Sequence, residues 1–155
     1  MRIRKFHLSD AAELARLHRG TIRGINVLDY PPKQIAVWSW HVSARRFRES
    51  AKDRIRYVAI ENNKIIGFGD FDEKGEMTGL YVHKDYQGKG VGQRLLKVLE
   101  RHALKIGIKE FKLSSTITAL DFYKRQGYKV IRKSIHPIKN QRLIVYLMKK
   151  HLRNL

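Results

Sequence analysis

The spacing of apolar residues changes character about one third of the way along the chain. Over the first fifty residues, apolar side chains recur every three or four positions, which predicts two amphipathic helices. The first is capped at Ser9 or Asp10 and ends within residues 20–24; Asp10 and Glu13 have the spacing of a capping box. The second follows the Pro31-Pro32 turn and carries Ile35, Trp38, Val42 and Phe47.

From residue 55 onward, apolar and polar residues alternate as they do in strands. Residues 55–61, 65–71 and 77–83 predict an antiparallel meander with turns at Asn62-Asn63 and at the EKGE segment. The remaining predicted elements are a helix that ends at Gly107, a strand over 111–115, a short helix over 118–126, and a hairpin of 128–135 with 142–150. This order predicts an α/β protein with a mixed sheet in which strands 77–83 and 111–115 are parallel.

Length and composition limit the class of protein. A chain of 155 residues with 43% hydrophobic content can bury one core, so we expect a single domain over 1–155. The absence of cysteine excludes disulfides, thiolate zinc sites and a cysteine nucleophile. No apolar run is long enough to span a bilayer, which predicts a soluble, cytoplasmic protein without a membrane partner.

The charge is strongly positive and unevenly distributed. Lys and Arg number 33 against 14 Asp and Glu, a formal net charge of +19. Residues 124–155 hold ten Lys or Arg and no acid, whereas Asp70, Asp72, Glu73 and Glu76 form an acidic group. Such a surface attracts nucleic acids or anionic cofactors.

The QGKGVG segment, residues 87–92, joins a predicted strand to a predicted helix. Backbone N–H groups at a helix N-terminus favour a phosphate or pyrophosphate, glycines let the ligand approach, and Lys89 adds a cation. The alternative is a glycine turn that only bends the chain. The motif is not a Walker A loop, because Lys89 is followed by glycine and not by Ser or Thr. It is not the GxGxxG dinucleotide fingerprint either, because its glycines have the spacing GxGxG.

Two motifs in this region resemble those of the GNAT N-acetyltransferases. The run LYVHKDYQGKGVGQRLL resembles their acetyl-CoA signature [QR]xxGx[GA], with Gln87, Gly90 and Gly92 in its three places. The run TITALDFYKRQGY resembles their second motif, NxxAxxxYxxxG[FY]; Ala119, Tyr123, Gly127 and Tyr128 match it, and Thr116 stands where the family often has Asn. The resemblance covers about residues 55–130. It implies the GNAT fold, a mixed sheet of six to seven strands flanked by about four helices.

The resemblance also implies a cofactor and its binding residues. In this family the strand at 77–83 splays from the strand at 111–115, and the arm of acetyl-CoA inserts between them. The backbone of residues 87–92 then cradles the pyrophosphate, and an N–H near Leu80 or Tyr81 stabilises an oxyanion. The implied cofactor-binding residues are Leu80, Tyr81, Val82, Gln87, Gly88, Lys89, Gly90, Val91, Gly92, Thr116 and Phe122.

The implied reaction is direct attack of a primary amine on the thioester within a ternary complex. Tyr123 is the predicted catalytic acid, with an ordinary buried aromatic as the alternative. Glu76 is the first candidate for the base, ahead of its acidic neighbours and His83, although a solvated hairpin explains these acids equally well. Tyr30, held by the Pro31-Pro32 turn, and His41 are predicted to be exposed and to contact the acceptor, and Trp38 is expected in the core.

Two other functions stay open at this stage. The basic C-terminal third is compatible with a nucleic-acid-associated domain, and a GNAT-like domain can also sense acyl-CoA without turnover. Family members often pair, so a homodimer is a further expectation. The acceptor amine itself has no signature in the sequence.

Overall fold

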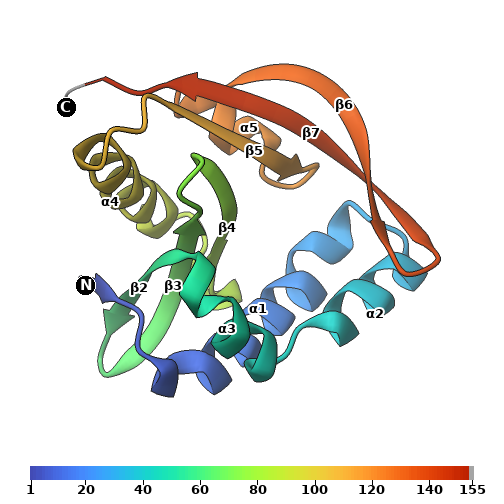
Figure 1. Ribbon diagram of the computed structural model, residues 1–155. Coiled ribbons are helices and arrows are strands. Elements are labelled where there is room, and N and C mark those ends of the chain that lie inside the picture. Colours follow the sequence, from blue (N-terminus) through green and yellow to red (C-terminus); the bar gives the residue numbers. More distant parts are fainter. Residues whose placement is uncertain (154–155) are drawn as a thin grey trace.

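The computed structural model describes residues 1–153, which form a seven-stranded mixed sheet in the order β1-β2-β3-β4-β5-β7-β6 (Figure 1). The strands are β1 Arg2–Lys5, β2 Ile55–Glu61, β3 Lys64–Phe71, β4 Glu76–Val82, β5 Glu110–Thr116, β6 Lys129–Ile138 and β7 Gln141–His151. The helices are α1 Ala11–Gly24, α2 Pro32–His41, α3 Ala44–Ser50, α4 Val91–Lys105 and α5 Leu120–Arg125. The predicted mixed sheet is confirmed, with five α-helices beside it.

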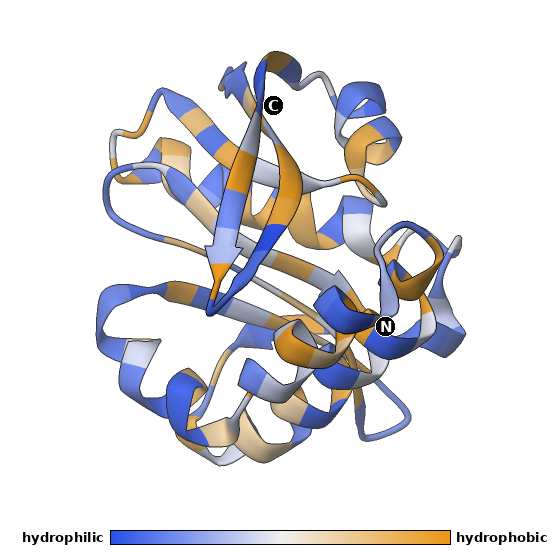
Figure 2. Ribbon diagram, turned by 90° about the vertical axis from the view of Figure 1, so that its right-hand side faces the viewer, coloured by the Kyte–Doolittle hydropathy of each residue, from blue (hydrophilic) through white to orange (hydrophobic). Residues whose placement is uncertain are grey.

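The central meander forms as the alternation predicts. β2 and β3 pair in antiparallel register around Asn62 and Asn63, whose φ angles of 52° and 60° belong to a tight hairpin turn. β4 and β5 are parallel, as predicted for strands joined through a helix. Along the β6–β7 hairpin, short hydrophobic runs such as Leu143-Ile144-Val145 are separated by hydrophilic residues (Figure 2).

The N-terminal region differs from the prediction in three respects. β1 was not predicted; it pairs antiparallel with β2. The predicted Asp10–Glu13 capping box is wrong, because Asp10 accepts hydrogen bonds from the His7 N–H and from Arg4, both at 2.8 Å, while Glu13 accepts from the N–H of Ile65. The second predicted helix is two helices, since Val42 is extended and Ser43 caps α3 by accepting from Arg46.

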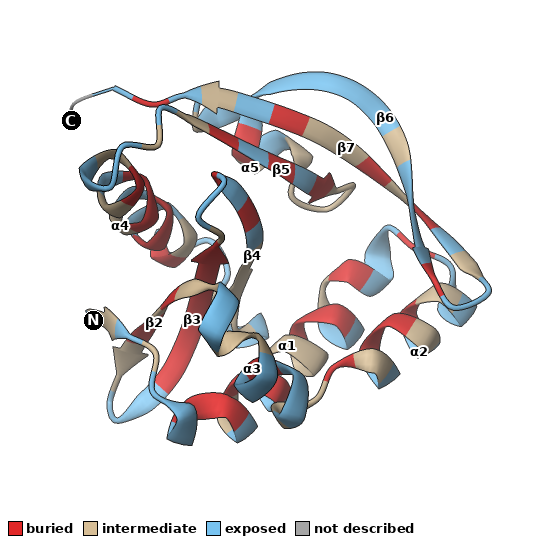
Figure 3. Ribbon diagram, in the orientation of Figure 1, coloured by how far each residue is buried: buried red, intermediate tan, exposed pale blue. Residues whose placement is uncertain are grey.

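The core lies on both faces of the sheet. Helices α1, α2 and α3 pack over one face around Phe68 of β3, whereas α4 and α5 pack with Phe71, Met77 and Phe111. Figure 3 shows that buried residues gather along β3 and on α1 and α4. Within residues 1–153, no helix has both the length and the apolar character that crossing a bilayer requires.

The ladder between β4 and β5 is short. It holds only the pairs Glu76↔Lys112 and Met77↔Leu113, after which the two strands diverge (Figure 1). β5 stays paired with β7 as far as Thr116, and β4 stays paired with β3 as far as Val82. The expected splay is therefore present, and it leaves the facing backbone groups of both strands without ladder partners.

A β-bulge on β4 lies where the splay begins. Met77 pairs with Phe71 and Gly79 pairs with Asp70, so Thr78 is the extra residue between two consecutive pairs. Bulges re-aim side chains and are frequent beside active sites. Here Met77 and Leu80 both pack toward α4, while Tyr81 packs toward α1.

Candidate active site

The glycine loop has the backbone of an anion cradle. Gly88 and Gly90 have φ angles of 72° and 82°, a region that favours glycine, and a Cβ on either residue would point into open space. Gly90 is the N-cap of the 15-residue helix α4, and its carbonyl accepts the first helical hydrogen bond, from Arg94. The N–H groups of the first turn thus lack helical partners and face outward. These features fit a pyrophosphate.

The loop is fixed to the end of β4. The carbonyl oxygen of Val82 accepts two hydrogen bonds of 2.8 Å, one from Gln87 Nε2 and one from the hydroxyl of Thr21 on α1. The loop is therefore positioned by both the sheet and α1. The Lys89 side chain takes no part in these hydrogen bonds, and its ammonium lies 5.3 Å from the centre of the Tyr86 ring.

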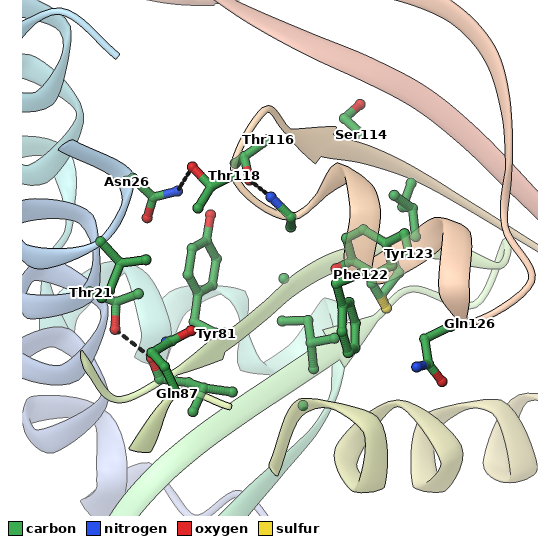
Figure 4. A pocket seen from close by; sticks show the side chains of 18 of the residues that line it. Thr21, Asn26, Tyr81, Gln87, Ser114, Thr116, Thr118, Phe122, Tyr123 and Gln126 are labelled. Carbon is green, nitrogen blue, oxygen red and sulfur yellow. Dashed lines mark hydrogen bonds between the residues drawn. The ribbon is translucent and has the colours of Figure 1, made fainter. Parts of the chain in front are cut away.

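A cavity of about 940 Å³ occupies the splay between β4 and β5 and extends to the glycine loop (Figure 4). Most of the residues predicted to bind the cofactor line it, together with both predicted catalytic residues. They are Glu76, Leu80, Tyr81, Val82, Gln87, Gly88, Gly90, Val91, Gly92, Thr116, Phe122 and Tyr123.

Two polar side chains mark the cavity wall near α5. The Thr116 hydroxyl accepts a hydrogen bond from the Ala119 N–H at 3.1 Å, and its own proton remains for a ligand. Asn26 donates to Thr118 at 3.1 Å, but its Oδ1 is buried and has no partner within residues 1–153. Asn26 was not predicted, because nothing near it in the sequence indicates that the loop after α1 reaches this wall.

Tyr123 is buried beside the cavity. Its residue exposure is 5%, and its ring packs 5.2 Å from Phe122 and 5.6 Å from Tyr128. Figure 4 shows Phe122 and Tyr123 projecting from α5. Burial raises the pKa of Tyr123 above its ordinary value, so the phenol keeps its proton.

The acidic group divides into different roles. Glu76 is exposed and lines the cavity at the end of β4 that still pairs with β5. Asp72 Oδ1 accepts from the N–H groups of Lys74 and Glu76 and so shapes the β3–β4 turn. His83 Nδ1 accepts from the Asp85 N–H at 3.1 Å, and burial lowers the pKa of His83.

Asp70 belongs to a buried network. Its carboxylate accepts from Arg56 Nε at 2.6 Å and from the hydroxyl of Thr78, and both charged side chains are at most 5% exposed. Arg56 also donates to the Phe47 carbonyl and to Ser50, each at 2.9 Å. With both carboxylate oxygens engaged, Asp70 is a poor candidate for the base.

The two predicted acceptor residues differ in their placement. The exposure predicted for Tyr30 is wrong: Tyr30 is buried, donates to the Ile144 carbonyl at 2.6 Å and accepts from the Ile117 N–H at 2.9 Å. The Pro31-Pro32 turn thus points this phenol inward. His41 is half-buried and lines a second cavity, of about 510 Å³. Trp38 is in the core, as expected, with an edge on each cavity.

Comparison with known proteins agrees with this geometry. The family model described as "Acetyltransferase (GNAT) domain" matches residues 26–151. An uncharacterized N-acetyltransferase, YjcF of Bacillus subtilis, is 26% identical over 66% of this chain and 76% of its own length.

Solved structures share the fold at low sequence identity. A GCN5-related N-acetyltransferase from Rhodopseudomonas palustris has a TM-score of 0.93 at 24% identity, covering 97% of this chain and 95% of its own. The PaiA N-acetyltransferase from Thermoplasma acidophilum, solved in complex with coenzyme A, has a TM-score of 0.80 at 23% identity, covering 97% and 98%. With its family match, its fold and its two motifs, the chain belongs to the GNAT acetyltransferase domain family.

Proposed function

We propose that the protein is an acetyl-CoA-dependent N-acetyltransferase that acetylates a primary amine by direct attack in a ternary complex. The observation that carries the proposal is the meeting of two features at one cavity. The splay of β4 from β5 leaves strand edges open, and it leads directly to the glycine loop at the start of α4. Acetyl-CoA supplies an acetyl group already activated as a thioester.

The chain's own residues divide the binding work. The N–H groups of Val91 and Gly92 at the start of α4 suit the pyrophosphate, and the free edge of β4 suits an amide-bearing arm, which can pair as an added strand. The free Oδ1 of Asn26 and the hydroxyl proton of Thr116 offer an acceptor and a donor at the opposite wall. An unpaired N–H near Leu80 or Tyr81 can stabilise negative charge on the reacting oxygen.

Proton transfer is proposed to involve Tyr123 and Glu76. The raised pKa of Tyr123 supports its role as an acid, because the phenol stays protonated at neutral and moderately alkaline pH. Glu76 lies four residues before Leu80 on β4, and a regular strand rises about 3.3 Å per residue, so with the bulge at Thr78 the two Cα atoms are at most about 13 Å apart. Glu76 therefore acts through water if it accepts the proton of the amine.

The direct test is calorimetric titration with acetyl-CoA of the wild type and of Gly90→Glu. The new side chain puts an anion in the cradle and should weaken binding at least tenfold. Gly107→Glu is the matched control, because Gly107 also has a positive φ, of 92°, and open space around it, at the other end of α4. This control should bind as the wild type does.

Each further outcome points to a different function. No acetyl-CoA binding by the wild type would overturn the proposal. Binding without acetylation of any amine would favour the acyl-CoA-sensing alternative. RNA binding that persists at saturating acetyl-CoA and falls steeply with salt would support a nucleic-acid role for the charge of +19.

A further inference from the structure

The second cavity adjoins the first at the bulge of β4. The residues that line both cavities are Trp38, Arg54, Thr78, Gly79, Tyr81 and His136. The second cavity reaches from this junction to α3 and to the turn between β6 and β7. A molecule in it therefore meets the proposed cofactor cavity at Thr78 and Gly79, beside the splay.

The charged side chains around the second cavity are nearly all cationic. Arg46 comes from α3, Arg54 from the residue before β2, and Lys139 from the turn between β6 and β7. The single carboxylate in its lining, Asp70, is already bound by Arg56 and Thr78. Within residues 1–153, Arg46, Arg54 and Lys139 have no carboxylate within ion-pair distance.

Two histidines, His18 and His41, line the second cavity. Its wall includes His18, whose Nε2 is buried without a hydrogen-bond partner among the described residues. The pKa of His41 is lowered by burial and then by the positive charges of Arg46 and Lys139. An incoming ligand thus meets a positive field.

We propose that the second cavity binds the acceptor, and that the acceptor is an amine that also carries an anionic group, a carboxylate or a phosphate, held by Arg54 with Arg46 and Lys139. This inference rests on the proposed acetyltransferase function. Of these three cations, Arg54 borders both cavities, so it can hold an anionic group close to their junction, whereas Arg46 and Lys139 suit an anionic group farther along the second cavity.

The same charges also aid the chemistry. The attacking amine must lose a proton, and neighbouring positive charges favour the neutral form of an amine. A polycationic acceptor would be repelled by the same field. The cavity thus selects an anionic amine and lowers the cost of deprotonating it, which reduces the need for a base close to the amine.

The test compares matched acceptors that differ in one group. In a first series, n-propylamine is the reference, and acetylation rates are compared with those of β-alanine (a carboxylate), O-phosphoethanolamine (a phosphate) and 1,3-diaminopropane (a second amine). In a second series, tyrosine, tryptophan and leucine are each compared with the corresponding decarboxylated amine. We expect kcat/KM to be at least tenfold higher for the anionic member of at least one pair. Comparison of the carboxylate-bearing and phosphate-bearing amines shows which anionic group the site prefers.

Substitutions in the second cavity test whether it causes the preference for anionic amines. Arg54→Gln should raise the KM for the preferred anionic amine at least tenfold and change kcat/KM for the partner without the anionic group less than twofold. Arg48→Gln is the control, since Arg48 is an exposed residue of the same helix as Arg46 and lies outside the cavity lining. It should leave the preference unchanged.

A second measurement does not require turnover. Trp38 borders both cavities, so its fluorescence should change when an anionic amine binds to the protein saturated with CoA. If CoA binds but none of the anionic amines binds or reacts in preference to its partner, this inference is overturned and the proposed function stands. If CoA itself does not bind, the proposed function fails first.

Discussion

The guanidinium of Arg56 holds the carboxylate of Asp70 inside the protein, with Nε 2.6 Å from Oδ2, at the wall of the second cavity. Arg56 also lies over the rings of Phe6 and Phe47, at 4.8 and 5.0 Å. Its neighbours come from the residue after β1, from α3 and from β3, so one side chain connects three segments, of which α3 and β3 border the cavity. We expect the pair to be structural.

Arg56→Met should lower the free energy of unfolding by about 3 kcal/mol, because it leaves Asp70 buried without its cation. Urea denaturation measures the change. Arg45→Met is the matched control: Arg45 lies 2.7 Å from Glu49, but both side chains are exposed, so its loss should not measurably change stability. Equal effects of the two substitutions would contradict the structural role. The variant Arg56→Met with Asp70→Leu should regain most of the lost stability.

Tyr30→Phe tests the reassignment of Tyr30 from substrate contact to structure. The substitution removes the hydroxyl that joins the Ile144 carbonyl to the Ile117 N–H, leaving both without this partner. We expect the free energy of unfolding to fall by about 1–3 kcal/mol, while the KM for the acceptor stays within twofold. A tenfold rise in KM at unchanged stability would instead restore the predicted contact with substrate.

The sequence predicts best those elements that local patterns encode. β2 has the predicted bounds, because alternation over Ile55–Glu61 ends at two asparagines that adopt positive φ. β1 has only four residues, three of them Arg or Lys, and it is stabilised by pairing with β2 and by the Arg4–Asp10 ion pair. These contacts leave no periodic signal.

In the site, too, some features can be predicted from local sequence patterns and others cannot. The glycine loop and Tyr123 are visible in the sequence because each belongs to a short motif that resembles the family's. Arg46, Arg54 and Lys139 meet only in the folded chain, since nearly a hundred positions separate the first from the last. The sequence shows excess positive charge but not that some of it surrounds a cavity.

Tyr123→Phe should lower kcat by about a hundredfold and leave the KM for acetyl-CoA nearly unchanged, since the ring stays and only the acid is lost. Tyr128→Phe is the control. It removes a 2.7 Å hydrogen bond to Glu100, so it should cost about 1–2 kcal/mol of stability and spare kcat.

The pH profile gives an independent check on Tyr123. Burial raises its pKa above 10, so the wild type should lose no activity through ionisation of this phenol up to pH 10. An unaltered kcat in Tyr123→Phe would show that Tyr123 is only a core aromatic.

His18 makes the stability depend on pH in a direction that can be tested. The ring packs against Tyr81, Phe68 and Phe47, with centroids 4.0, 5.6 and 6.0 Å away, and burial lowers the pKa of His18 to about 3. In the unfolded chain the imidazole pKa is about 6.5. Between these values the unfolded chain binds a proton that the folded protein does not, so the free energy of unfolding falls as the pH falls from about 6.5 toward 3.

His18→Phe should remove this contribution while keeping an aromatic ring among aromatic neighbours. We expect the stability of the wild type to fall more steeply than that of the variant, by up to about 1.4 kcal/mol per pH unit, in urea denaturation at pH 7, 6, 5 and 4. His151→Gln, which replaces an exposed histidine of β7, should follow the wild type. Parallel curves for the wild type and His18→Phe would mean that His18 accepts a proton in the folded protein, with the cavity beside it open enough to hydrate the charge.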